Sequence, residues 1–261
     1  MMKEGIEMKQ IIWKQTPHLI AGTTLKDDQM KENGNLALHT PANYDAIIEN
    51  RSHFVDELGI SLDQCVFLKQ THSDHFVEVT KADAGKGSRV YEDAIHDCDA
   101  CYTKEHHLLI GVMTADCLPI ILYDELKEII AVIHSGWQGT IKQITKKVVD
   151  HLISQEQVDP RFIHVYFGPS IAFSSLEVGE EVYRQIEALP FDTTPYIQYL
   201  GHQKALIDNI GLNKAMLLQA GVKESHITID KNNTKSNNPS LFSYRNDHQC
   251  GRHFSYIMKR K

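Results

Sequence analysis

The sequence predicts an α+β protein in which mixed β-sheets pack as a sandwich with flanking helices. Two observations support this fold class. Short apolar runs that suit strands outnumber the amphipathic stretches that suit helices. These runs also fail to alternate regularly with helices, as a parallel α/β fold would require. Because no internal repeat or low-complexity linker divides the chain, we expect a single domain over residues 1–261.

The first helix is expected in TPANYDAIIENRSHFVDELG, where Thr40 can cap it, Pro41 suits its first position and Gly59 can end it. A second helix is expected in TIKQITKKVVDHLIS, and later ones around 177–188 and 206–220. The expected strands are CVFLKQTH, HFVEVT, LLIGVM, LPIILY, EIIAVIH, FIHVYFG, HITID and HFSYIM. The polar stretch DKNNTKSNNPS, 230–240, predicts an exposed loop.

The composition argues against nucleic-acid and membrane partners. The formal net charge is -7 and the pI is about 6.1, whereas binders of nucleic acid or anionic membranes usually carry a basic surplus. No run approaches the roughly 18 apolar residues of a membrane-spanning helix, and the first residues do not resemble a signal peptide. We therefore expect a cytoplasmic protein, whose five cysteines are thiols or ligands rather than a disulfide framework.

Three residues with metal-binding side chains follow or border strand-like runs: His72 in KQTHSD, Cys117 in TADC and His134 in IHSGWQG. Strand ends tend to present side chains into a shared crevice. Two imidazoles and a thiolate would suit Zn²⁺ with a fourth position open, and they also suit copper. The spacing matches no local zinc motif, so two ordinary histidines and a buried thiol are an equally good interpretation of these residues alone.

The pair Cys98 and Cys101 in CDAC predicts neither a redox site nor a metal site. A redox CxxC usually begins a helix after a strand, and this pair lies between acidic turn residues and YTKEHH. Asp99 between the two cysteines is of more interest than either thiol.

Several residues are candidates for holding an anion. GWQGT, after His134, begins a helix whose free N–H groups suit an anion, and FGPSI offers the Ser170 hydroxyl. Arg51, Arg245 and Arg252 carry the planar, permanently charged group that suits phosphate. Plain chain reversal and a solvated surface are the ordinary interpretations of these features.

The motifs together, in their order, resemble the laccase-domain family, also called multicopper polyphenol oxidases, whose bacterial members are described as purine nucleoside phosphorylases. The resemblance extends from about GNLALH at residue 34 to the C-terminus. The motifs that carry it are KQTHSD, DCDACYT, MTADCLPI, IHSGWQGT, FGPSI, EVGEEV and FSYRNDHQCGRHFSYI.

The resemblance implies a one-domain fold of mixed sheets flanked by helices, with His72, Cys117 and His134 as metal ligands. From the chemistry of these ligands we expect zinc, with copper as the second choice. The implied activities are phosphorolysis of adenosine, guanosine, inosine and methylthioadenosine, and deamination of adenosine. We expect small-molecule nucleoside and phosphate as partners, and a monomer or small homo-oligomer.

On this hypothesis, Arg51 and Arg245 are the expected phosphate contacts, and Gln138 and Ser170 are further candidate substrate or phosphate contacts. The family often has Arg where this chain has Gln138, and because Gln supplies no fixed charge, the charged contact is lost or moved at this position. The family also often has a Cys-Thr pair where this chain has Asn233-Thr234. Both departures bear on the substrate range more than on the metal site.

Cys117, Asp116 and His134 are the candidate catalytic residues. Asp116, beside the ligand Cys117, could handle a proton or only support the ligand. A rival hypothesis makes Cys117 the nucleophile of a hydrolase or deamidase with His134 as its base. A third hypothesis is a copper polyphenol oxidase, although the several His-rich sites of blue-copper oxidases have no HxH counterpart here. A fourth is a non-catalytic metal-binding protein.

Overall fold

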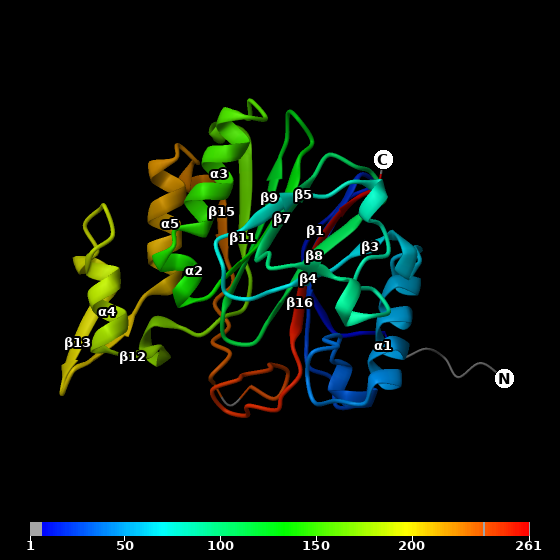
Figure 1. Cartoon of the computed structure of the whole chain (residues 1–261), viewed down its shortest axis with the longest axis horizontal. Helices are drawn as coiled ribbons and strands as arrows, with labels where there is room; N and C mark the ends of the chain where they lie inside the picture. Colours follow the sequence, from blue (N-terminus) through cyan, green and yellow to red (C-terminus); the bar gives the residue numbers. More distant parts are fainter. Residues whose placement is uncertain (1–6, 237, 261) are drawn as a thin grey trace.

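The structure, a computed structural model, describes residues 7–236 and 238–260 and shows two β-sheets packed face to face with helices on both outer sides (Figure 1). The five-stranded sheet consists, in spatial order, of β1 (Gln10–Gln15), β2 (Leu19–Thr24), β16 (His253–Lys259), β8 (Leu109–Thr114) and β3 (Cys65–Val66). The six-stranded sheet consists of β15 (Ile227–Ile229), β11 (Ile163–Phe167), β9 (Leu118–Asp124), β10 (Ile130–Ser135), β7 (Ala100–Thr103) and β5 (Phe76–Glu78). Both sheets mix parallel and antiparallel pairs, as expected for the predicted fold class.

The remaining elements lie around this sandwich. Two small sheets are formed by β12 (Glu177–Gly179), β14 (Lys204–Ile207) and β13 (Ile197–Gly201), and by β4 (Leu68–Lys69) with β6 (Ile95–His96). The helices are α1 (Tyr44–Glu57), α2 (Trp137–Ile141), α3 (Ile144–Ser154), α4 (Glu180–Glu187) and α5 (Asn209–Gln219). In Figure 1, α1 lies on one side of the sheets and α3 and α5 on the other.

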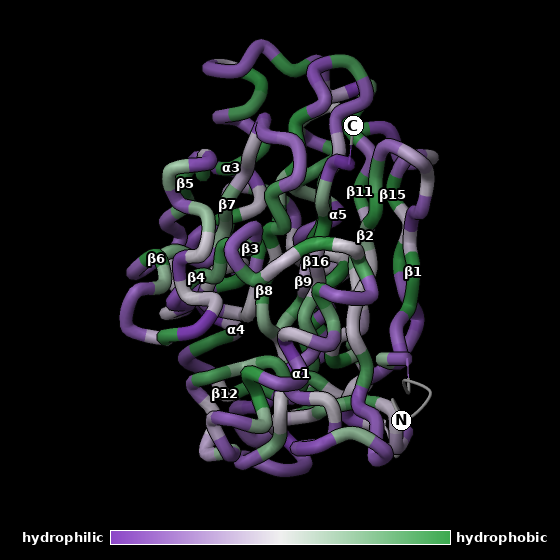
Figure 2. Tube along the Cα trace, turned by 90° about the vertical axis from the view of Figure 1, so that its right-hand side faces the viewer, coloured by the Kyte–Doolittle hydropathy of each residue, from purple (hydrophilic) through white to green (hydrophobic). Residues whose placement is uncertain are grey.

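The alternation of side chains along each central strand explains the layers. In β9, Ile120 and Leu122 pack toward α3, whereas Ile121 packs between the two sheets. In β16, Tyr256 packs toward α1 and Ile257 packs between the sheets. Strands that are buried on both faces form continuous apolar runs, which is why LPIILY and EIIAVIH are recognisable in the sequence. Figure 2 shows apolar segments along strands of both sheets, among them β1, β11 and β15.

The first helix begins later than expected. It starts at Tyr44, capped by Asn43, whose side chain accepts a hydrogen bond from the backbone N–H of Ala46. Thr40 does not cap it, because the helix begins four residues later; the Thr40 hydroxyl instead donates to the carbonyl of Ala37. The helix ends as expected before Gly59, which has a φ of +72° that glycine adopts without strain.

Two other expected elements are divided. The single helix expected in TIKQITKKVVDHLIS is two helices, α2 and α3, because Gln143 has a φ of +60° and interrupts the helical backbone. The strand expected in CVFLKQTH is β3 and β4, which pair in different sheets. The structure also contains β1 and β2, which the apolar pattern did not predict.

Candidate metal centre

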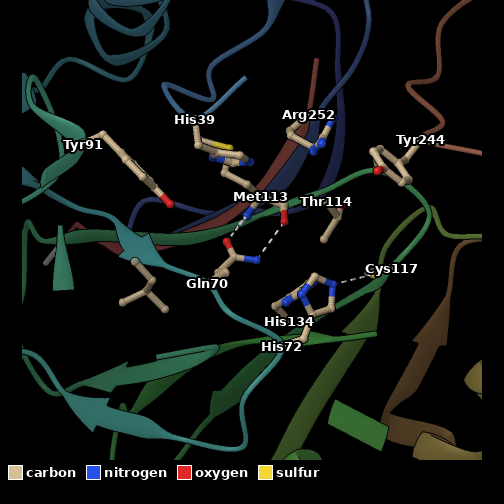
Figure 3. A pocket seen from close by; sticks show the side chains of 12 residues that line it. His39, Gln70, His72, Tyr91, Met113, Thr114, Cys117, His134, Tyr244 and Arg252 are labelled. Carbon is tan, nitrogen blue, oxygen red and sulfur yellow. Dashed lines mark hydrogen bonds between the residues drawn. The ribbon is translucent and has the colours of Figure 1, made fainter. Parts of the chain in front are cut away.

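Three segments that lie far apart in the sequence bring His72, Cys117 and His134 together (Figure 3). His72 lies in the loop after β4, Cys117 in the turn between β8 and β9, and His134 in β10. One side-chain nitrogen or sulfur atom from each residue lies within 4.8 Å of the others, and Cys117 Sγ is 3.8 Å from His72 Nε2. His134 is buried, and the other two side chains are half-buried.

The path of the chain between the two large sheets sets the position of Cys117. β8 belongs to the five-stranded sheet and β9 to the six-stranded sheet, so the turn over residues 115–117 crosses from one to the other. In the antiparallel pair of β9 and β10, His134 lies opposite Pro119. Cys117, two residues before Pro119, is therefore held close to His134 at the end of the sandwich.

A buried carboxylate, Asp99, orients both histidines. One of its oxygens, Oδ1, accepts hydrogen bonds from the backbone N–H of His72 at 3.0 Å and from Nδ1 of His134 at 2.7 Å. Oδ2 accepts from the backbone N–H groups of Thr71 and Ser73. Because Nδ1–H of His134 is committed to Asp99, Nε2 is the ring nitrogen left to act as a ligand.

Gly136 makes room for two of the three candidate ligands. A Cβ atom at this position would lie 2.8 Å from Cys117 Sγ and 3.1 Å from Cδ2 of His72. No real side chain tolerates the first distance, so the glycine of the GWQG motif is required by the close approach of the backbone to the site.

The charges of the three residues depend on one another. Burial opposes ionisation of the Cys117 thiol, but the neighbouring His134 and His72 outweigh it and hold the thiol pKa below its ordinary value. Burial disfavours the protonated His134, but Cys117 and Asp99 outweigh burial and raise the pKa of this imidazole. The cluster is therefore arranged to stabilise a thiolate.

This donor set fits a metal ion. A thiolate and two imidazoles are the ligands that zinc takes in sites with an open fourth position, and copper accepts the same set. The atoms are close enough to reach one ion, and the Asp99–His134 hydrogen bond is the support that metal-binding histidines usually have. Among the described residues this is the one such group of three or more potential ligands.

Two pockets meet at the candidate ligands His72 and Cys117 and also share Ala115 and Tyr244. The His39 pocket, of about 360 Å³, is further lined by His39, Leu68, Gln70, Tyr91, Met113, Thr114, His134 and Arg252. The Trp137 pocket, of about 230 Å³, is further lined by Asp116, Gly136, Trp137, Ile171, Leu176, Asn209 and Arg245. Figure 3 shows His39 and Arg252 across the first pocket from His72 and His134. Each pocket thus combines His72 and Cys117 with one arginine, and His134 lines the His39 pocket.

The structure brings some of the expected substrate contacts to the site and leaves others away from it. Arg245 lines the Trp137 pocket. Arg51 lines neither pocket: it is buried, and its guanidinium donates to the carbonyls of Leu36, Gly87 and Ser88 and stacks on the ring of Phe67. Arg51 therefore ties loops together, and Arg252 is the arginine that lines the His39 pocket in its place.

Gln138 and Ser170 also lie outside both pocket linings. Gln138 is the second residue of α2, and its neighbour Trp137 lines the pocket instead. The Ser170 hydroxyl oxygen is buried without a hydrogen-bond partner in the described part of the chain. Asp116 lines the Trp137 pocket, but both of its carboxylate oxygens already accept hydrogen bonds, from Thr234 Oγ1 and from the backbone N–H of Arg245.

Sequence reasoning missed the aromatic and polar lining of the pockets. Tyr91 lies outside the family motifs, and His39 and Tyr244 lie within GNLALH and FSYRNDHQCGRHFSYI, where nothing in the residue type indicates a place in a pocket. Thr234 is buried, although it lies in the loop expected to be exposed. A signal for its importance was present in the sequence, because Thr234 occupies the second position of the Cys-Thr pair that the family often has. Cys98 and Cys101 are free thiols that pack in the apolar layer between the sheets, away from the three candidate ligands.

Comparisons with known proteins identify the family. The sequence matches the family model described as multi-copper polyphenol oxidoreductase laccase over residues 25–260. The chain belongs to this family. The family expected from the sequence motifs is thereby confirmed.

Two relatives are named as enzymes. The chain is 32% identical over 255 residues to purine nucleoside phosphorylase YlmD of Bacillus subtilis, covering 94% of this chain and 91% of that protein. It is 33% identical over 236 residues to a purine nucleoside phosphorylase of Staphylococcus saprophyticus, covering 89% and 88%.

Two solved structures share the fold. YlmD from Geobacillus stearothermophilus superposes with a TM-score of 0.89 at 26% identity, covering 97% of this chain and 100% of that chain. The Bacillus licheniformis hypothetical protein YfiH gives a TM-score of 0.89 at 27% identity, covering 95% and 98%. The mixed α+β fold expected from the sequence is confirmed.

Proposed function

We propose that this protein is a zinc-dependent purine nucleoside phosphorylase that cleaves adenosine, inosine, guanosine and methylthioadenosine, and that it also deaminates adenosine. The observation that carries the proposal is the group of His72, Cys117 and His134 at the junction of two pockets, each of which contains an arginine. The names of the relatives from B. subtilis and S. saprophyticus supply the reaction class.

Phosphorolysis requires one pocket for a nucleoside and room for phosphate beside it. An oxygen of phosphate attacks C1′ of the ribose, the bond from C1′ to the purine nitrogen breaks, and the purine leaves with the electron pair and takes up a proton. The ribose gains positive charge as this bond breaks, and the purine gains negative charge. Two pockets that meet at one point allow the two substrates to approach from different sides.

The arginines supply the anion contacts in this proposal. The guanidinium of Arg252 is oriented by hydrogen bonds to the carbonyls of Cys250 and Gly251. The guanidinium of Arg245 is oriented by a hydrogen bond to the carbonyl of Glu177 and keeps further donors free for phosphate. Arg245 is exposed and Arg252 is half-buried, so a phosphate can reach both groups from solvent.

His72, Cys117 and His134 would hold the zinc ion. When bound, zinc supplies positive charge and Lewis acidity where the two pockets meet. Deamination of adenosine replaces the amino group at C6 with oxygen from water and releases ammonia. Asp99 contributes to both reactions by keeping the two histidines in place.

A second candidate function uses Cys117 as a nucleophile. The lowered pKa of its thiol, beside His134 and His72, is also what a cysteine hydrolase or deamidase requires. A thiolate committed to a metal is a poor nucleophile, so the state of Cys117 in the purified protein separates the two functions.

The test is a phosphate-dependent assay on inosine with identified products. We expect hypoxanthine and ribose 1-phosphate, no cleavage without phosphate, and loss of most activity in His134→Ala. Cys117→Asp, which keeps an anionic ligand and removes the thiol, should retain some zinc and a small residual activity. Release of free ribose without phosphate would reject phosphorolysis. Adenosine without phosphate tests deamination through the release of ammonia.

Within the described residues, no helix has the length and apolar character needed to cross a bilayer. We propose that the protein acts in the cytoplasm as a monomer or small homo-oligomer, on small molecules rather than on nucleic acid or membranes.

A further inference from the structure

The turn between β8 and β9 holds a carboxylate whose backbone has an uncommon conformation. Asp116 has a φ of +81°, in a region that few residues other than glycine, asparagine and aspartate adopt. Its Oδ1 accepts a hydrogen bond from Thr234 Oγ1 at 2.6 Å, and its Oδ2 accepts one from the backbone N–H of Arg245 at 2.7 Å. The side chain and Thr234 are both buried.

Asp116 thereby connects segments that are far apart in the sequence. Thr234 and Arg245 belong to the long connection between β15 and β16, drawn in orange and red at one end of the sheets in Figure 1. The backbone carbonyl of Asp116 also accepts a hydrogen bond from the N–H of Ile171, in the connection after β11. One residue therefore holds two separate connections against the turn that carries Cys117.

The two connections are also bonded to each other. The N–H of Thr234 donates to the carbonyl of Ser170 at 3.0 Å. Asn233 accepts at Oδ1 from the N–H of Ala172 and donates from Nδ2 to Ser175 Oγ. The asparagine that replaces the usual cysteine of the family thus links the same two segments.

These segments make one wall of the Trp137 pocket. Ile171 and Leu176 come from the first connection, and Tyr244 and Arg245 from the second. Asp116 lies between them and beside the candidate ligand Cys117. The hydrogen bond to Asp116 therefore holds the Arg245 backbone from which the guanidinium extends, while the guanidinium itself donates to the carbonyl of Glu177.

We propose that Asp116 is a positioning residue that fixes Tyr244 and Arg245 over the Trp137 pocket, and that it does not transfer a proton in the reaction. Both carboxylate oxygens already accept a hydrogen bond from another segment of the chain, so the geometry occupies them in holding these segments together. This inference rests on the proposed function, because Arg245 is its proposed phosphate contact.

Asp116→Asn separates positioning from proton transfer. An asparagine oxygen can accept from the N–H of Arg245, and its NH₂ can donate to Thr234, because a hydroxyl also accepts. Asparagine also tolerates the positive φ. We expect Asp116→Asn to keep kcat and the KM for phosphate within about threefold of wild type.

Two further variants remove the contacts themselves. Thr234→Val deletes one hydrogen bond at constant shape, and Asp116→Gly deletes the carboxylate without straining the backbone. We expect both to raise the KM for phosphate about tenfold while zinc content stays at the wild-type level. Thr228→Val, at an exposed position in β15, is the matched control and should behave as wild type.

Proton transfer by Asp116 would give the opposite pattern. Asp116→Asn would then lose about a hundredfold or more in kcat, while Thr234→Val would stay near wild type. That result overturns the proposal, and so does an unchanged KM for phosphate in both Thr234→Val and Asp116→Gly.

Hydrogen exchange of the backbone over residues 243–247 tests the positioning role without any turnover. We expect faster exchange in Thr234→Val and Asp116→Gly than in wild type and Asp116→Asn. Equal exchange in all four proteins overturns the positioning role. The exchange comparison is independent of activity. If the variants differ in exchange as expected but the wild-type protein does not cleave inosine with phosphate, the proposed function is rejected and the positioning role remains supported.

Discussion

Replacing Asp99 with asparagine should weaken both the fold and the candidate metal site. The carboxylate of Asp99 is fully buried and accepts hydrogen bonds from the backbone N–H groups of Thr71, His72 and Ser73 and from His134 Nδ1. Burial opposes ionisation of Asp99, but its hydrogen bonds outweigh burial and hold its pKa well below the usual range. The folded state therefore requires, at residue 99, a side chain whose two polar atoms both accept hydrogen bonds.

The size of the effect follows from the donors that face each oxygen. An amide NH₂ in place of Oδ1 would face the N–H of His72 and Nδ1–H of His134, and in place of Oδ2 it would face the N–H groups of Thr71 and Ser73. Either orientation leaves one buried and one partly buried donor without an acceptor, at about 1–3 kcal/mol each. We expect a loss of about 4 kcal/mol from the free energy of unfolding, and zinc affinity lower by about 10–100-fold.

Urea unfolding in the presence of a chelator measures the first effect, and zinc competition with a chromophoric chelator measures the second. Asp97→Asn is the matched control, because the Asp97 side chain lies in the same segment but is 58% exposed. This control should stay near wild type in both measurements. An Asp99→Asn protein that matches Asp97→Asn in stability and in zinc affinity would refute the role given to Asp99.

Three further predictions concern other residues around the site and the core. Gly136→Ala should lower zinc affinity in the same competition assay, because its Cβ would lie 2.8 Å from Cys117 Sγ. The control Gly139→Ala should keep the wild-type zinc affinity, and equal affinities of the two variants would count against the close approach at Gly136. The pKa of buried His253 is lowered to about 4 by burial, so wild type should lose up to about 3 kcal/mol of stability as pH falls from about 6.5 to 4, since the unfolded chain binds the proton more readily. In urea unfolding across this range His253→Gln should show a smaller pH dependence, and an identical dependence would contradict the assignment. Iodoacetamide should alkylate Cys117 slowly in zinc-loaded protein and faster after chelation, which peptide mass mapping can measure. Rapid alkylation of Cys117 in the zinc-loaded protein, with a matching loss of activity, would favour the cysteine hydrolase.

The sequence predicted the part of the site that apolar runs define. LLIGVM, LPIILY and EIIAVIH are strands buried on both faces, and their ends carry Cys117 and His134. His72 was predicted as the third ligand because it has a metal-binding side chain and lies at the end of another strand-like run. The chain passes from one sheet to the other between β8 and β9, and this passage brings the three residues together. No local feature of the sequence predicts it.

The sequence could not predict contacts that depend on distant segments. The burial of Arg51 follows from carbonyl groups of residues 36, 87 and 88, and nothing near Arg51 in the chain indicates them. Thr234 lies in a polar stretch that is typical of an exposed loop, and its burial follows from its hydrogen bond to Asp116. The break at Gln143 likewise depends on a single backbone angle within an otherwise helical pattern.

The proposed function requires His72, Cys117 and His134 to hold one zinc ion on which phosphorolysis depends. The most direct measurement is metal content by mass spectrometry on untagged protein, with inosine phosphorolysis assayed on the same samples at graded zinc occupancy. We predict up to one zinc per chain, activity proportional to occupancy, and loss of both in Cys117→Ala. Full activity after removal of the metal, or copper as the ion that restores activity where zinc does not, would contradict the claim.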